Sequence, residues 1–429
     1  MSPRPAPGTV EADLEALTLK PRRDRQIWGI YFGLIVISLI ELYSASSREV
    51  TDGHILAPLF RHAILLFVGF LIMVFLQRVN YRKFRRLTWW IVFISIAATF
   101  YTMFYGQIIN GARRSFSLIL FSVQPSELLK FSAALLIARV LADGQIKVQG
   151  RPDVTNRALI IVGSFVLLFG ILLVNQGLTN TILLMAISLS MMCIGGVPWK
   201  KLFIVVLIYG SLGGIYWVVK SASATNKEEA TLVAGEPGDR TNLRKKRIAN
   251  FFSSEKYNDP ITSENQQEQY SFIAQANGGT FGVFPGNSRE TARLPLAFSD
   301  YIYAIIIEDT GLMGGLVVMV LYLWLLARAG RIASQCKRAY PALLVIGMAV
   351  FIVYQALFHM AIVTGFFPVS GQPLPFISKG GSSVIISSVA LGMMLSVSRY
   401  AGRKNIRDEK AERMSDLSEG TLTDNPAQL

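Results

Sequence analysis

The chain has 429 residues, of which 52% are hydrophobic and only 16% are charged. Soluble globular domains carry about 25% charged residues, so this composition excludes an ordinary soluble enzyme and indicates apolar surface that faces lipid. The formal net charge of +14 would by itself also suit a nucleic-acid-binding protein. The two cysteines and three histidines show no metal-ligand spacing, so they predict neither a disulfide framework nor a Cys/His metal site.

Ten segments are long and apolar enough to be membrane spans, which need about 20 mostly apolar residues each. They run at 27–46, 59–77, 88–106, 127–142, 157–174, 179–197, 202–219, 301–327, 341–364 and 377–398. The first is too long for the apolar core of a signal peptide, so we expect a retained helix. The sequence thus predicts an all-α polytopic membrane domain over 27–400, a cytoplasmic N-terminal tail over 1–26 and a disordered cytoplasmic tail over 401–429.

Lys and Arg residues gather in every second loop of this arrangement. They cluster at 22–25, 78–86, 139–157, 200–201, 328–338 and 399–407. Because cytoplasmic loops accumulate Lys and Arg, the pattern places both termini in the cytoplasm. The positive charge is therefore explained by topology, and no nucleic-acid partner is expected. Residues 220–300 form a predicted large external loop between helices 7 and 8, with a basic run at Arg240–Arg247 and a glycine-rich stretch at Gly278–Gly286.

Ionisable residues at predicted helix ends are the first candidates for function, because such residues are costly at membrane depth. Glu127 and Lys130 share one helix face by their i,i+3 spacing, which suits either a structural ion pair or the rim of a catalytic site. Asp300 precedes helix 8, where it is either a helix N-cap or a functional carboxylate. Glu308 and Asp309 lie deeper in the same helix and are expected to pack against another polar helix.

The segment from Gly365 to Ser383 contains three prolines and four glycines. It cannot be a plain helix, and irregular backbone at membrane depth must be buried in protein or line a cavity. The sequence predicts either a pocket near the outer leaflet or an ordinary external turn here.

At these residues the sequence resembles the SEDS family (shape, elongation, division and sporulation), which includes FtsW and RodA. The resemblance covers roughly residues 27–400, and its motifs occur in family order: Gly111–Arg114 with Gln124–Lys130, Gln269–Tyr270 with Gly278–Ser288, Leu294–Ala304, and Pro368–Ser383. The run Phe298–Tyr303 and the long tail look more like FtsW than RodA. The sequence departs from the family pattern at Ser115, Asn175–Leu178, His359 and Lys379.

The resemblance implies an enzyme of the bacterial inner membrane that polymerises lipid II into glycan strands, with undecaprenyl pyrophosphate as the leaving group. Asp300 matches the family's essential acid and is the candidate general base, and Glu127 and Lys130 match a supporting polar pair. The substrate-binding candidates are Arg114, Gln124, Ser126, Arg244, Arg247, Ser299, Ser378, Gly380, Gly381 and Ser382. The sequence establishes no cofactor. Either the basic run of the external loop or a divalent cation such as Mg²⁺ would neutralise the pyrophosphate.

Three other functions stay open from sequence: a lipid II flippase, a RodA-type enzyme of cell elongation, and a non-catalytic scaffold. A transporter site usually lies at the bilayer midplane between repeats, whereas the motif residues here gather at the external face. The expected partners are lipid II, a class B penicillin-binding protein that supplies the transpeptidase, and other divisome or elongasome membrane proteins.

Overall fold

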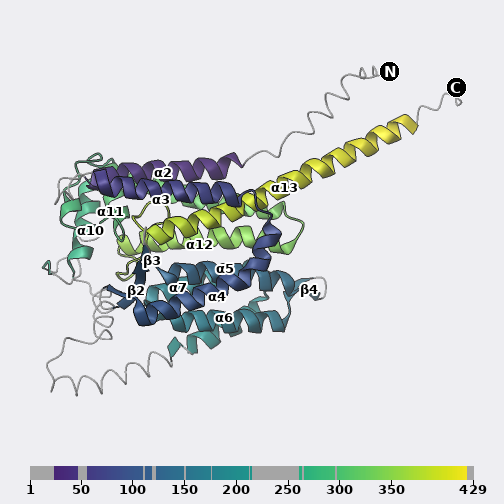
Figure 1. Cartoon of the computed structure of the whole chain (residues 1–429), viewed down its shortest axis with the longest axis horizontal. Coiled ribbons are helices and arrows are strands. Elements are labelled where there is room, and N and C mark those ends of the chain that lie inside the picture. The colour runs from purple at the N-terminus through teal and green to yellow at the C-terminus, as the bar shows by residue number, and fades with distance from the viewer. Residues whose placement is uncertain are drawn as a thin grey trace.

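The structure is a computed structural model that describes residues 24–46, 56–109, 112–117, 122–148, 151–174, 176–211, 213–214, 260–262, 265–294 and 297–422. Within these ranges the chain is a bundle of long helices that run along one common direction (Figure 1). The helices are α2 (Arg25–Ser46), α3 (Leu56–Leu76), α4 (Tyr81–Tyr105), α5 (Pro125–Asp143), α6 (Asn156–Val174), α7 (Leu178–Ile194), α10 (Gln266–Gly278), α11 (Ile302–Ser334), α12 (Ala339–Val363) and α13 (Gly381–Leu422). Residues 199–211 are also helical, and η1 (Glu290–Ala292) is a short 3₁₀ turn.

Five short strands join these helices. An antiparallel sheet in the order β1-β2-β3 is made of β1 (Gln107–Ile109), β2 (Ala112–Ser117) and β3 (Ser122–Val123), and β4 (Gln145–Val148) pairs with β5 (Arg151–Val154). The sequence analysis did not predict them. Strands of two to six residues are too short to show the alternating pattern by which strands are recognised.

Seven of the described helices are long and apolar enough to cross a membrane, namely α2, α3, α4, α6, α11, α12 and α13 up to Ala401. The apolar helix α7 is shorter. All ten predicted spans coincide with a helix or with part of one, since α5 covers the fourth and residues 199–211 cover part of the seventh. The chain is therefore a multi-pass helical membrane protein.

The centre of the bundle is formed by α5, α12 and α13. Within their apolar windows, 72% of α12 and 78% of α13 is buried, against 22% of α3 and 28% of α4. Most of α5 is buried as well, and it packs against α4, α6, α7 and α12. The outer helices expose large apolar side chains such as Phe67, Phe93 and Val317, as expected for surface that contacts lipid rather than water.

The two ends of the bundle differ in chemistry. One end, here called the loop end, carries α10, β2, β3 and the irregular segment 368–380 (Figure 1). The other end, here called the basic end, carries the β4–β5 hairpin and the starts of α2, α4 and α12. At the basic end Lys201 donates a hydrogen bond to Asp153 (2.8 Å), which lowers the pKa of that carboxyl.

Helix α11 is broken at Gly311, whose φ of 72° interrupts the helix. The end of the predicted external loop is inserted at this break: Val283 N donates to Glu308 O (2.9 Å), and Leu312 N donates to Gly279 O (2.9 Å). The Glu308 side chain accepts hydrogen bonds from the Ser288 hydroxyl and from the Arg289 backbone N–H. Glu308 therefore holds the predicted external loop and not another helix, whereas Asp309 accepts a hydrogen bond from Ser44 of α2. The prediction that both residues pack against another polar helix holds for Asp309 only.

The glycine-rich stretch is explained by close backbone packing at this break. A Cβ atom on Gly278 would lie 2.0 Å from the carbonyl oxygen of Ile307, and one on Gly282 would lie 2.3 Å from that of Asp309. Gly282 also has a φ of +80°, which side chains other than hydrogen rarely allow. The described geometry of the stretch is therefore that of a fixed contact with α11.

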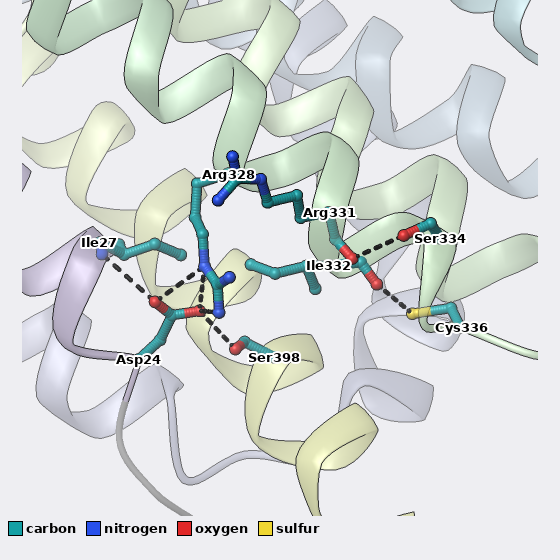
Figure 2. A network of polar contacts seen from close by, with 8 residues as sticks. All are labelled: Asp24, Ile27, Arg328, Arg331, Ile332, Ser334, Cys336 and Ser398. Atoms are coloured by element: carbon teal, nitrogen blue, oxygen red, sulfur yellow. Dashed lines mark hydrogen bonds and ion pairs between the residues drawn. The ribbon is translucent and has the colours of Figure 1, made fainter. Parts of the chain in front are cut away.

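A buried polar clasp joins three helices at the basic end (Figure 2). Asp24, directly before α2, accepts hydrogen bonds from Arg328 of α11 (Nη2 to Oδ2, 2.9 Å) and from Ser398 of α13 (2.7 Å). Its other oxygen accepts from Ile27 N (3.4 Å) in the first turn of α2. Only 2% of the Asp24 side chain is exposed. The clasp fixes the relative positions of helices that are far apart in sequence.

Helix α13 continues to Leu422, beyond the predicted end of the tenth span. Residues 401–422, predicted as part of a disordered tail, are thus described as helix. Opposite charges lie four residues apart at Lys404/Asp408 and at Glu409/Arg413, a spacing that supports an isolated helix.

Candidate functional site

The two signature segments predicted from sequence meet at the loop end. The turn before α11 is joined to the irregular segment by two hydrogen bonds, from Lys379 N to Phe298 O (2.9 Å) and from Ser378 Oγ to Ser299 O (2.7 Å). Ser378 Oγ also accepts a hydrogen bond from Leu374 N (2.7 Å), so one hydroxyl ties together both segments. Because segment 374–378 is buried, the turn that carries Asp300 is held rigidly.

The Asp300 carboxylate lies at the entrance of helix α11. The helix begins at Ile302, and Tyr301 occupies its N-cap position without a side-chain hydrogen bond to the helix. The Asp300 carboxylate lies against Gly371, where a Cβ atom would come within 2.5 Å of its Oδ2. Asp300 is half-buried.

Gly371 lines a narrow polar cleft beside Asp300. The other lining residues come from the start of α5, from the turn before α7 and from the irregular segment: Gln124, Ser126, Gln176, Gly177, Asn180, Ser370 and Gln372. Gln124 and Ser126, two of the predicted substrate-binding residues, lie in the wall of this small cleft, whose volume is about 10 Å³. Residues 176–177, where the sequence departs from the family pattern, lie in the same wall.

Lys130 is fully buried and belongs to this polar region. Its Nζ donates to Asn180 Oδ1 (3.0 Å) and to Gln372 Oε1 (3.1 Å), and Gln372 Nε2 also donates to Asn180 Oδ1 (3.0 Å). His359 Nδ1 lies 2.6 Å from the backbone oxygen of Gln372. A buried ammonium must be compensated by hydrogen bonds, and here two amide oxygens provide them.

Glu127 uses different partners. It accepts hydrogen bonds from Ser382 Oγ (2.6 Å) at the start of α13 and from Gln355 Nε2 (3.2 Å) of α12. Among the described residues Glu127 and Lys130 form no direct salt bridge, although the two charges are close enough to interact electrostatically. Both groups instead fasten α5 to the irregular segment and to its neighbours.

Sequence reasoning missed Asn180, Gln355 and His359 as members of this network. Each is a buried polar residue inside an apolar helix, and intramembrane polar residues are a recognised signal of function. His359 and Asn180 had a second signal, since they lie at or next to positions that depart from the family pattern.

The remaining candidates are distributed as follows. Gly380 and Gly381 lie at the start of α13, next to Ser382, and the Gly380 N–H donates to Ser378 O (2.7 Å). Arg114 is on strand β2, but its side chain lies outside the described part of the chain, as do Arg244, Arg247 and the whole run Arg240–Arg247. Among the described residues, no group of three His, Cys, Asp or Glu side chains could hold a metal ion.

These features define a class: a polytopic membrane protein with a rigid, polar, partly open cleft at one membrane face. The family model of the cell cycle proteins FtsW, RodA and SpoVE matches residues 24–403, and the chain belongs to this family.

Individual relatives agree with this assignment. The chain is 28% identical over 403 residues to a probable peptidoglycan glycosyltransferase FtsW of Aliivibrio salmonicida, covering 91% of this chain and 93% of the relative. It is 29% identical over 378 residues to the stage V sporulation protein E of Bacillus subtilis, covering 86% and 94%.

Two solved structures share the fold. One, described as "Structural coordination of polymerization and crosslinking by a peptidoglycan synthase complex", matches with a TM-score of 0.65 at 22% identity over 88% of this chain and 98% of that chain. The other is the rod shape determining protein RodA of Thermus thermophilus, with a TM-score of 0.59 at 20% identity over 88% and 97%.

Proposed function

We propose that this chain is a peptidoglycan glycosyltransferase that polymerises lipid II at the outer face of the cytoplasmic membrane, in septal wall synthesis during division. Family membership and the relatives named FtsW support the activity and the septal role. The observation that carries the proposal is the placement of Asp300 beside a polar cleft: its carboxylate lies against Gly371 of the cleft wall, and the turn that carries it is hydrogen-bonded to the irregular segment.

The proposed topology has ten spans with both termini in the cytoplasm. Seven of these spans are the long apolar helices, and the other three are α5, α7 and the helix at 199–211. The large external loop connects the seventh span to α11. The basic end then lies at the cytoplasmic face and the loop end at the outer face, in agreement with the rule that cytoplasmic loops accumulate Lys and Arg.

In the proposed mechanism Asp300 acts as general base. The hydroxyl of the incoming lipid II attacks the anomeric carbon of the growing chain, its proton passes to the Asp300 carboxylate, and the bond to the pyrophosphate breaks with its electron pair. A positioned base contributes typically about 10²–10⁴-fold. A single displacement inverts the anomeric centre and needs no second carboxylate. The leaving pyrophosphate needs positive charge, which we assign to the basic run at Arg240–Arg247.

Lys130 and Glu127 are proposed to shape the cleft rather than to react. Lys130 donates a hydrogen bond to Gln372, which is next to Gly371 in the chain. Glu127 accepts one from Ser382, in the first turn of α13. Gly371 in turn contacts the Asp300 carboxylate. Both charged groups are therefore positioning residues for the base.

The partner is proposed to be a class B penicillin-binding protein, which would cross-link the strands that this chain makes. The matched peptidoglycan synthase complex supports this choice by its description. A partner that presses on the external loop would act on the break of α11, because the loop is hydrogen-bonded there.

The activity is tested with purified chain and fluorescent lipid II, by resolving the product lengths. We expect polymer from the wild type and none from Asp300→Asn, with both proteins equally folded. Transbilayer movement of lipid II without polymer would identify a flippase instead. Polymerisation by Asp300→Asn at the wild-type rate would contradict the assignment of the base.

A further inference from the structure

A cavity of about 350 Å³ lies at the basic end, between α4, α5 and the start of α12. Five arginines line it: Arg82, Arg85, Arg86, Arg139 and Arg338. Tyr81 and Tyr340 also line it, and both side chains are buried. No hydrogen bond of normal geometry to a described residue fixes their hydroxyl oxygens, although Tyr81 lies beside Arg82 and Tyr400, and Tyr340 lies beside Thr88. The cavity therefore combines guanidinium groups with two tyrosine hydroxyls.

The charge of this cavity is largely uncompensated. Among the described residues, Asp143 is the one carboxylate that pairs with any of the five arginines, and it contacts Arg85. The arginines are held by other groups: Arg139 donates to the backbone oxygen of Arg85 (2.6 Å), and Arg85 lies over the ring of Tyr340 at 5.9 Å. Guanidinium groups match phosphate geometry closely, so this preformed cluster suits a phosphate group.

Part of the cavity wall belongs to an exposed face of α4. Arg82, Arg86, Trp90 and Phe93 follow one another at intervals of four, four and three residues, so they share one helix face. Trp90 and Phe93 are 66% and 65% exposed. Tryptophan side chains mark the level of the membrane interface. The arginines thus lie at head-group depth, directly above an apolar stripe that acyl chains can cover.

We propose that this cavity binds the head group of an anionic glycerophospholipid. The arginines contact its phosphate, the two tyrosine hydroxyls donate hydrogen bonds to its oxygens, and its acyl chains lie along α4. Basic pockets between membrane helices bind anionic lipid head groups in this manner. The site lies at the opposite end of the bundle from Asp300, so it is separate from the proposed catalytic cleft.

The test is a binding titration of the full-length chain, in a non-ionic detergent, with fluorescent short-chain phosphatidylglycerol. The double variant Arg82→Gln/Arg338→Gln is expected to weaken binding by about fivefold for each arginine removed. The matched control Arg78→Gln/Arg157→Gln removes two exposed basic residues at the same end of the bundle but outside the cavity, and it should bind as the wild type does. If the first double variant does not fold, Arg86→Gln tests the same site, since this exposed side chain makes no hydrogen bond to other described residues.

Three results would overturn the proposal. Equal binding of the zwitterionic phosphatidylcholine would mean that charge is not recognised. Equal losses in the control variant would mean diffuse electrostatic attraction without a site. Binding of inorganic phosphate or of a polyprenyl diphosphate more tightly than phosphatidylglycerol would assign the cavity to another phosphate source. None of these measurements depends on polymerisation, so the proposed enzymatic function is tested separately.

Discussion

Gly371→Ala is the most direct test of the geometry at Asp300, because it changes the position of the carboxylate and leaves its chemistry intact. The new methyl group would lie 2.5 Å from Asp300 Oδ2, whereas real Cβ contacts are essentially never below 3.0 Å. The carboxylate must therefore move by at least about 0.5 Å. A misplacement of about 1 Å can cost roughly 10²-fold in rate, so we expect a loss of about tenfold in kcat.

The assay is polymerisation of fluorescent lipid II by purified variants, with kcat and KM measured separately. Overpacking costs typically about 1–3 kcal/mol, so the variant should be somewhat less stable but still folded. Gly330→Ala is the matched control, since no atom lies within 4 Å of its added Cβ. A Gly371→Ala enzyme with unchanged kcat would show that the position of Asp300 does not limit the reaction, and the general-base assignment would fail.

Three further predictions concern the groups that hold the site and the bundle. The double reversal Glu127→Lys/Lys130→Glu should not restore polymerisation lost in the single reversals, because the two side chains have separate partners; recovery would show a direct pair. Gly282→Ala should lower the melting temperature and the activity together, since its Cβ would lie 2.3 Å from a backbone oxygen of α11. A melting temperature equal to that of the wild type would refute close packing at this position. Arg328→Ala should destabilise the fold by about 3–5 kcal/mol, because it leaves the buried Asp24 carboxylate unpaired. Chemical unfolding measures this loss, and Arg331→Ala, an exposed residue one turn further, should have little effect.

The sequence by itself determined the membrane fold and which segments carry the candidate site. Runs of about 20 apolar residues leave no alternative to spanning helices, and the helices follow the predicted segments closely. Asp300 and the irregular segment were found because charges, prolines and glycines are costly at membrane depth unless they serve a purpose.

Only the tertiary structure decided which of these residues act together. Lys130 could be matched with Glu127 by spacing, but its actual partners, Asn180 and Gln372, are 50 and 242 residues away in sequence. The glycines at 278 and 282 stand out in the sequence, but the reason for them, the close approach of α11, is visible only in the structure. Local sequence fixes backbone preference and helix faces. Hydrogen-bond partners of a buried charge are chosen by helix packing, which brings distant segments together and has no local signature in the chain.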